Sequence, residues 1–319
     1  MRKPKVVLPI LLVATLALAA CGTADTTSQA AAPASAGDAK IDLSANQNRL
    51  RAKKVDEIAN LVPADVRARG TLVVGTTGNG TPPLSFHADD DKTVIGVEPD
   101  LAQLVADVLG LKLDLQATSW ENLFLSVETG QYSAGFANIT VTEERKDKYD
   151  FATYRTDTIA FEVRTDRDIR ISEAKDIAGL KVGVGAGTNQ EQILVRWDEQ
   201  NKAAGLKPAQ FVYYQNTSDY YLALRSKRVD VYAGPNPTAA YHVAVGGETK
   251  IVGTMSGGGR VPAQIAAMTK KGNGLVEPLN KALQAEIANG QYAEVLKHWN
   301  LTSEALPASE INPPGLPRK

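Results

Sequence analysis

The amino-acid sequence predicts an α/β protein whose folded part is divided into two successive lobes. Runs of β-branched residues alternate with segments that carry apolar residues at helical spacing, which is typical of sheets covered by helices. This alternation begins at Thr71 and begins again at Leu180. The chain of 319 residues is also long enough for two domain-sized cores.

The first lobe is expected to open with the buried strand TLVVGTT at 71–77, followed by a hairpin-like segment at 89–96. Further elements then alternate, namely a helix at 98–110, a strand at 112–118, a helix at 120–130 and a strand at 133–140. Gly110 and Gly130 end these helices, as glycine commonly does. Strand alternating with helix predicts a parallel sheet.

The second lobe repeats the pattern. Its expected elements are a strand, Gly-rich turn and helix at 180–197, a strand at 209–216, a helix at 218–228 and a strand at 229–236. A strand at 262–271 and two helices at 274–300 close the fold, and these helices are expected to return to one of the lobes. Residues 47–69 predict a partly helical arm, and the Pro-rich tail at 304–319 is expected to lie extended on the surface.

The N-terminus predicts an exported, lipid-anchored protein. Residues 1–20 combine basic residues with an apolar run that ends in small residues, which is a secretory signal too short to be a spanning helix. Leu18-Ala19-Ala20-Cys21 resembles the lipobox of bacterial lipoproteins, which implies cleavage before Cys21, a diacylglyceryl thioether on it, and further acylation such as palmitate. Residues 22–40 form a flexible tether within the 21–70 segment that precedes the folded part.

Composition excludes several classes of function. Three of the 35 Lys and Arg residues lie in the signal, so 36 Asp and Glu leave the mature chain with a charge of about −4 and without a basic block for nucleic acid. Three histidines lack ligand spacing and the acidic run at 88–92 lacks the EF-hand pattern, so no metal is expected. The Gly-rich turn at 185–192 lacks the lysine of a nucleotide loop, and no cofactor is expected.

Arg145 stands in an unusual place. Thr142 is a good helix N-cap and Glu143 and Glu144 suit the positive end of the helix dipole, whereas a cation at the third position opposes it by a few tenths of a kcal/mol. Two readings follow from the residues. Arg145 is either a surface charge paired with Glu144 or Asp147, or a clamp for an anion.

Several motifs occur in an order that resembles a known family. They are PPLSF and EPDLA near 82–102, W..L...ETGQY at 120–132, ITVTEERKDKYDFA at 139–152, LKVGVGAGTNQE at 180–191, and KRVDVY at 227–232. From about Thr71 to about Leu301 the chain resembles the solute-binding proteins of polar amino-acid ABC importers, the family 3 extracellular binding proteins of bacteria. The resemblance implies a two-lobed, type II periplasmic-binding-protein-like fold that closes about a hinge.

The resemblance also implies how the chain is divided. Crossovers would fall near 162–164 and 261–263, so lobe one would comprise 71–162 and 263–303, and lobe two would be 163–262.

The resemblance assigns ligand-binding roles to specific residues. Arg145 would hold the α-carboxylate of the ligand bidentately, since its planar fork matches a carboxylate. The other contacts would come from both lobes, namely Trp120, Ala137, Asn138 and Thr140 in lobe one, and Thr188, Asn189 and Asn236 in lobe two. Thr140 is assigned to the ligand because Thr142 better fits the helix cap. Trp120 would otherwise be read as a core residue.

Two positions depart from the family pattern. Pro235 stands where the family usually has an Asp that binds the α-ammonium, and the neighbouring Asn236 supplies no countercharge. Another acid such as Asp219 would have to substitute, a point the sequence leaves open. Thr81 replaces the aromatic residue usually found before PP.

The resemblance therefore implies a monomeric, membrane-tethered receptor on the outer face of the cell membrane, or on its periplasmic side. It would capture a small carboxylate-bearing solute and present it to ABC permease subunits, without catalysis. One rival is an exported enzyme on the same fold, like the cyclohexadienyl dehydratases, which would need a general acid in the cleft. A sensor ectodomain is the third reading, disfavoured because no kinase domain follows.

Overall fold

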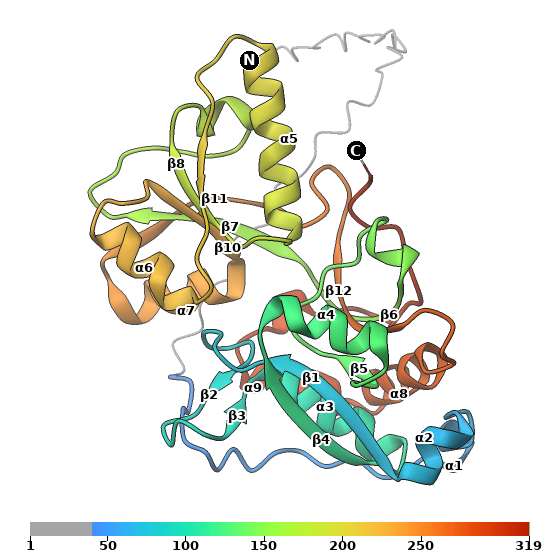
Figure 1. The fold of residues 1–319 in the computed structure, drawn as a ribbon. Coiled ribbons are helices and arrows are strands. Elements are labelled where there is room, and N and C mark those ends of the chain that lie inside the picture. The colour runs from blue at the N-terminus through green and yellow to red at the C-terminus, as the bar shows by residue number, and fades with distance from the viewer. Residues whose placement is uncertain (1–39, 319) are drawn as a thin grey trace, which may run out of the picture.

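The computed structural model describes residues 40–318, which form two lobes joined by crossing segments (Figure 1). Cys21 and the predicted signal lie outside these residues. The five-stranded sheet of lobe one has, in spatial order, β4 (Lys112–Thr118), β1 (Thr71–Thr77), β5 (Ala134–Gly135), β12 (Gln264–Lys270) and β6 (Tyr149–Thr156). The sheet is mixed rather than parallel, because β12 returns from lobe two and runs antiparallel to β5 and β6.

Helices cover both faces of this sheet. Leu72 and Val74 of β1 point into the larger core, while Val73 between them packs on the smaller one, which is the period-two alternation of a strand. The larger core contains residues of α3 (Val97–Val108), α8 (Val276–Asn289) and α9 (Gln291–His298), and the smaller contains residues of α4 (Trp120–Thr129). Burial on both faces explains why Leu72, Val73 and Val74 follow one another in β1 without polar residues between them.

Short elements complete lobe one. They are α1 (Asp56–Ala59), α2 (Ala64–Arg69), the hairpin of β2 (Phe86–His87) and β3 (Val94–Ile95), and the 3₁₀ turns η1 (Arg145–Asp147) and η3 (Thr302–Glu304). The closing helices pack in lobe one, the lobe that the resemblance implies, whereas the chain order left the lobe open. The structure describes no helix long and apolar enough to cross a membrane in residues 40–318.

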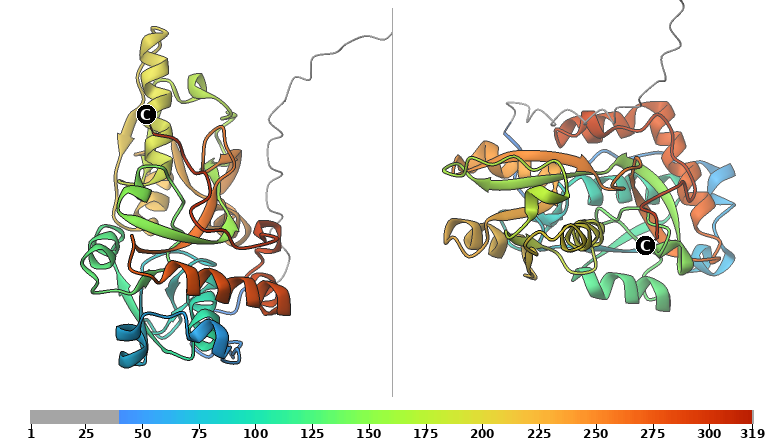
Figure 2. Two further views of the ribbon diagram at one scale, coloured as in Figure 1. Left: turned by 90° about the vertical axis from the view of Figure 1, so that its right-hand side faces the viewer. Right: turned by 90° about the horizontal axis from the view of Figure 1, so that it is seen from above.

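Lobe two is built around a second five-stranded sheet (Figure 2). Its strands in spatial order are β11 (Thr249–Ser256), β7 (Thr158–Arg164), β10 (Val231–Pro235), β8 (Lys181–Val184) and β9 (Gln210–Val212). Its helical elements are η2 (Ala174–Ile177), α5 (Asn189–Ala203), α6 (Thr217–Arg225) and α7 (Asn236–Gly246). Val182, Val184 and Val231 lie in its core, so the second strand–helix repeat encloses a core of its own.

The first crossover lies at Asp157 rather than near 162–164. β6 belongs to the first sheet and β7, which begins at Thr158, to the second. Residues 149–164 are extended almost without interruption, so the backbone conformation does not mark where lobe one ends. The boundary is set by which sheet each strand pairs with. The chain returns between Ser256 and Gln264, a range that includes the expected position 261–263.

A fully buried arginine connects distant parts of lobe one. Arg155 of β6 contacts Glu98 of α3 at 2.6 Å, Glu304 of η3, and the side-chain oxygen of Asn138 at 2.7 Å. Tyr154 donates its hydroxyl to the other oxygen of Glu98. Two carboxylates thus share one guanidinium, and burial raises the pKa of Glu304 to about 7 although Arg155 acts to lower it.

The raised pKa of Glu304 predicts a pH-dependent stability. Because the folded state binds this proton more tightly than the unfolded chain, the contribution of Glu304 is full below about pH 4.5 and declines as pH rises to about 7. Glu304→Gln should therefore flatten the fall in unfolding free energy between pH 4.5 and 7, at about 1.4 kcal/mol per pKa unit. Urea unfolding at several pH values measures it. Glu310→Gln, at an exposed position, is the control, and equal slopes in both variants would contradict the prediction.

Candidate functional site

The candidate site is a cavity of about 150 Å³ between the lobes. Lobe one lines it with Thr77, Gly80, Thr81, Leu84, Ser85, Glu98, Trp120, Ala137 and Asn138. Lobe two lines it with Gly185, Thr188, Asn189, Gln190, Thr217, Tyr232, Ala233, Gly234, Pro235 and Thr238. Five residues predicted to bind the ligand are thereby brought together from segments far apart in the sequence.

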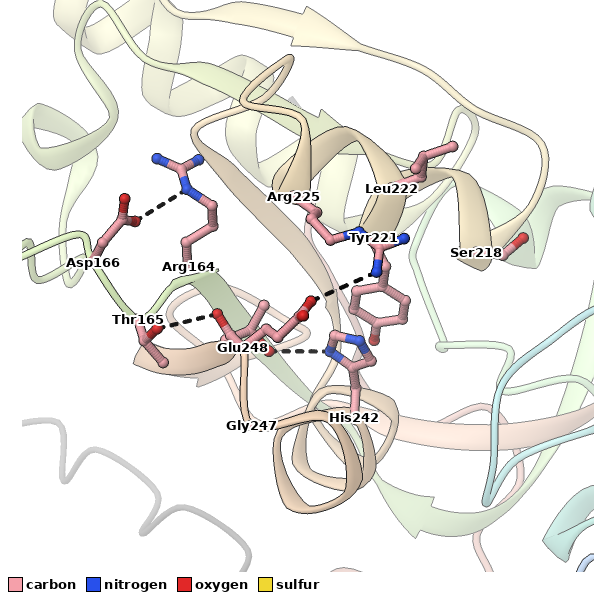
Figure 3. A pocket seen from close by; sticks show the side chains of 11 residues that line it. Arg164, Thr165, Asp166, Ser218, Tyr221, Leu222, Arg225, His242, Gly247 and Glu248 are labelled. Atoms are coloured by element: carbon pink, nitrogen blue, oxygen red, sulfur yellow. Dashed lines mark hydrogen bonds and ion pairs between the residues drawn. The ribbon is translucent and has the colours of Figure 1, made fainter.

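A larger hollow of about 550 Å³ lies on lobe two (Figure 3). Its charged side chains pair with one another, Arg164 with Asp166 at 3.0 Å and Arg225 with Glu248 at 3.8 Å. None of the predicted ligand-binding residues lines it. The cleft between the lobes is therefore the better candidate despite its smaller volume.

Local structure explains how lobe one presents its residues to the cleft. Ser119 caps α4 by accepting from the backbone N–H of Asn122 at 3.3 Å, which places Trp120 as the first helical residue at the cleft. Ala137 and Asn138 follow β5. Asn138 takes the left-handed conformation with φ 54°, and its side-chain oxygen is held by Arg155. The buried ion cluster therefore positions one wall of the cleft.

The start of α5 forms the wall from lobe two. The hydroxyl of Thr188 accepts from the N–H of Glu191 at 3.2 Å, so its side chain serves as the helix cap. Asn189 is 3% exposed and donates to Asp157 and to the carbonyl of Gly257, both at 2.9 Å. The positive end of α5 thus faces the cleft, where it favours an anionic group.

Asp157 joins the two lobes at the crossover. One of its carboxylate oxygens accepts from Thr140 of lobe one at 2.7 Å and from Asn189 of lobe two at 2.9 Å. Burial raises the pKa of Asp157, an effect opposed by these two hydrogen bonds and by nearby Arg155 and Arg145. Thr140 is 1% exposed and does not line the cavity, so its hydroxyl is engaged by the protein instead of the cleft.

Arg145 lies beside the cleft and bridges the lobes. Its N–H groups donate to the carbonyl oxygens of Thr140 at 2.8 Å and of Gly187 in lobe two at 3.0 Å. Its guanidinium carbon is 5.3 Å from the ring centre of Trp120 and 5.1 Å from that of Phe124. Burial lowers the pKa of Arg145 to about 10, so the side chain stays charged at neutral pH.

The backbone at Arg145 forms a short turn instead of the expected helix. Residues 145–147 form a single 3₁₀ turn, in which the hydroxyl of Thr142 accepts from the N–H of Arg145 at 3.1 Å. The cap position of this turn is Glu144 rather than the expected Thr142, although the hydroxyl of Thr142 still bonds the N–H three residues later as a capping side chain does.

Pro235 lines the cleft and Asn236 does not. Asn236 begins α7, is 2% exposed, and its side-chain oxygen has no hydrogen-bond partner among the described residues. Asp219 also lies outside the cavity lining. The carboxylate that does line it is Glu98, which the sequence analysis missed because an acid near a helix start is explained by the helix dipole alone.

Metal binding finds no support in residues 40–318, which hold no group of three or more His, Cys, Asp and Glu side chains placed to bind an ion. The groups available to a ligand are hydrogen-bonding side chains, the ring of Trp120 and the buried cation of Arg145 beside the cleft.

Sequence comparisons find related proteins. A profile of the bacterial extracellular solute-binding proteins, family 3, matches residues 72–302. The L-cystine-binding protein TcyJ of Escherichia coli K12 is 36% identical over 166 residues, which cover 52% of this chain and 59% of TcyJ. The match thus spans less than two thirds of that relative. The arginine-binding protein ArgT of Corynebacterium glutamicum is 28% identical, with 81% of this chain and 83% of ArgT covered.

Solved structures share the two-lobed fold. An ancestral arginine-binding protein bound to arginine has a TM-score of 0.64 and 30% identity, covering 72% of this chain and 98% of that one. The ancestral amino acid-binding protein AncCDT-1, described as a precursor of cyclohexadienyl dehydratase, has a TM-score of 0.63 and 26% identity, covering 74% and 97%. The predicted type II, two-lobed α/β fold is thereby confirmed.

Asp157→Ala should destabilise the protein by about 1–3 kcal/mol, because it removes the shared acceptor of two buried donors from different lobes. Urea unfolding measures the change. Asp219→Ala is the matched control, since that carboxylate accepts from its neighbour Asn216 and should cost less than about 0.5 kcal/mol. Equal stabilities for the two variants would contradict the role assigned to Asp157.

Proposed function

Because the chain belongs to the bacterial extracellular solute-binding proteins of family 3, we propose that it captures a small carboxylate-bearing solute, an amino acid or a derivative, between its lobes and delivers it to an ABC permease. The binding proteins for cystine and arginine among its relatives support this ligand class. Binding to both lobes would favour their closed arrangement, which the permease recognises.

The observation that carries the proposal is the pairing of Arg145. This buried cation donates to two neutral carbonyl oxygens, one in each lobe. A carboxylate is a stronger partner for a desolvated guanidinium than a carbonyl, and its two oxygens match the guanidinium fork. A ligand carboxylate would therefore replace the carbonyl of Gly187, while Trp120 packs on the ligand and the start of α5 presents the positive end of its dipole.

The part of the proposed site that would bind the amine of the ligand departs most from the family pattern. Pro235 supplies no countercharge, and the cleft carboxylate Glu98 already accepts from Arg155 and Tyr154. An α-ammonium group would therefore gain less charge-assisted bonding here than beside an unpaired aspartate. This favours solutes whose affinity rests mainly on the carboxylate.

The rival function is that of an exported dehydratase. It is considered because AncCDT-1, which shares the fold, is a precursor of cyclohexadienyl dehydratase. Glu98 is the carboxylate in the cleft on which a general acid role would fall. Both of its oxygens already act as hydrogen-bond acceptors, which disfavours proton donation to a substrate. Formation of product from arogenate would favour the enzyme over the receptor.

The proposal includes a lipid anchor at Cys21, followed by the tether, on a monomer exported to the outer face of the membrane. The lipobox-like residues before Cys21 and the extracellular character of the family support it.

Thermal unfolding with amino acids, their decarboxylated amines and their deaminated acids tests the binding proposal. A carboxylate ligand at about 1,000 times its Kd should stabilise the protein by roughly 4 kcal/mol, because it binds the folded state alone. The response should vanish in Arg145→Ala and weaken in Arg145→Lys, which keeps the charge and loses the fork. Arg225→Ala, on the hollow of lobe two, is the control and should respond fully. Stabilisation by amines alone, or a full response in Arg145→Ala, would refute the clamp.

Cys21→Ser tests the anchor. The variant should move from the membrane fraction to the soluble fraction after cell breakage, because the acyl chains that hold the protein are lost. Retention of the variant in the membrane fraction to the same extent as wild type would contradict lipid attachment at Cys21.

A further inference from the structure

The C-terminal segment Pro313–Arg318 runs along lobe one and also touches lobe two. Arg196 of lobe two donates to the carbonyl of Pro317, while the side chain of Arg318 pairs with Asp147 of lobe one. Figure 2 shows the dark red end of the chain leaving lobe one and reaching the neighbourhood of α5. The sequence predicts an extended surface tail, whereas Leu316 is only 2% exposed. We propose that this segment, the C-terminal strap, holds the two lobes in the arrangement seen here.

The strap is preceded by residues that bind the edge of the first sheet. The backbone N–H of Thr153 in β6 donates to the carbonyl of Glu310 at 3.0 Å. Asn312 donates its N–H to the carbonyl of Phe151 at 3.0 Å and accepts from the N–H of Phe151 at 2.9 Å. Because β6 is an edge strand, these bonds satisfy groups that would otherwise be open. The base of the strap is therefore fixed to lobe one.

The strap itself is bonded to the segment that carries Arg145. Leu316 donates its N–H to the carbonyl of Val141 at 3.2 Å, and its own carbonyl accepts from the N–H of Glu143 at 3.0 Å. Gly315 donates to the carboxylate of Glu143 at 2.9 Å. Thr142 and Glu143 are thus held immediately before the turn on which Arg145 lies.

The sequence PPGLP suits this docking. Prolines at 313, 314 and 317 have no N–H, so Gly315 and Leu316 provide the backbone donors of 313–317, and both are bonded to lobe one. A Cβ atom at Gly315 would lie 2.2 Å from the carbonyl oxygen of Val141, so only glycine allows this approach. The stiff prolines also reduce the conformational entropy lost on docking.

The side chain of Leu316 packs against lobe two. It packs in a buried cluster with Ile159 of β7 and Ile193 of α5, to which Trp197 and Met255 of lobe two also contribute. The Arg196 side chain of α5 donates to the carbonyl of Pro317 at 2.5 Å. The backbone bonds of Gly315 and Leu316 therefore lie on lobe one, whereas the apolar anchor and the carbonyl of Pro317 contact lobe two.

A relative movement of the lobes has to disturb one of these two attachments. Withdrawing Leu316 exposes apolar surface of the cluster, while retaining it breaks the backbone bonds to 141–143. The strap thereby adds a link that is separate from the polar contacts across the cleft, Asn79 with Asn216 at 2.7 Å and Gln192 with Glu144 at 3.1 Å. Weakening it should shift the equilibrium between lobe arrangements without altering a cleft residue.

The test is a distance measurement between the lobes by electron paramagnetic resonance in the absence of any ligand. Spin labels are placed on the full chain through Leu125→Cys in lobe one and Leu222→Cys in lobe two, which are 58% and 52% exposed, in a Cys21→Ser background. Leu316→Asp should populate a distance distribution that is broader or displaced from that of the parent. Leu316→Ala should raise the ratio of other arrangements to the present one by roughly tenfold.

Ile311→Asp is the matched control, because this residue precedes the strap and is 42% exposed, and its distribution should equal that of the parent. If circular dichroism shows that Leu316→Asp is unfolded, Leu316→Ala and Arg196→Gln serve as the test. Both should shift the distance distribution in the same direction. Unchanged distributions in the folded Leu316 variants would overturn the proposal. Since the readout needs no ligand, it is independent of whether the proposed solute binds.

Discussion

The ion cluster around Arg155 is the constraint on which much of the structure depends. A guanidinium that is 0% exposed must be compensated, and its partners come from α3, from the cleft and from the segment after α9. Loss of one partner would leave a charge buried and unpaired, which typically costs 3–5 kcal/mol. The cluster therefore fixes where the last helices return, and it orients Asn138 at the wall of the cleft.

The two buried arginines of lobe one differ in what they contact. Arg155 is surrounded by carboxylates and is satisfied within the protein. Arg145 donates to carbonyl oxygens and lies against aromatic rings, an environment that holds a cation without neutralising it. This contrast makes Arg155 a structural residue and Arg145 the functional candidate, although both are arginines in the same lobe.

The lobes are connected by chemistry of two kinds. At the crossover, Asp157 accepts hydrogen bonds from Thr140 and Asn189, and beside the cleft Arg145 donates to Gly187 of lobe two. At the C-terminal strap, an apolar side chain makes the connection. Polar contacts can exchange with a ligand or with water at modest cost, whereas withdrawing Leu316 exposes apolar surface. A ligand or water can therefore replace the polar contacts at the cleft, whereas the contact of Leu316 is lost only when apolar surface is exposed to water.

The sequence by itself determined the fold class and the succession of two strand–helix repeats, while the segments expected at the cleft came from the resemblance to the family. Local signals suffice for the fold class and the repeats, since strand and helix periods and capping side chains such as those of Thr142 and Ser119 act over a few residues. The same reasoning failed for the parallel sheet, and the resemblance placed the first crossover beyond its observed position, because pairing partners lie far apart in the chain. Thr140 shows why the sequence alone could not assign every residue of the site. The hydroxyl of Thr142 accepts from the N–H of Arg145, but the hydroxyl of Thr140, which was assigned to the ligand, donates to Asp157, a carboxylate 17 residues away in the chain. Only the tertiary structure decided that Glu98 faces the cleft, that Arg145 bridges the lobes and that Leu316 is buried, because long-range packing determines which groups come within bonding distance.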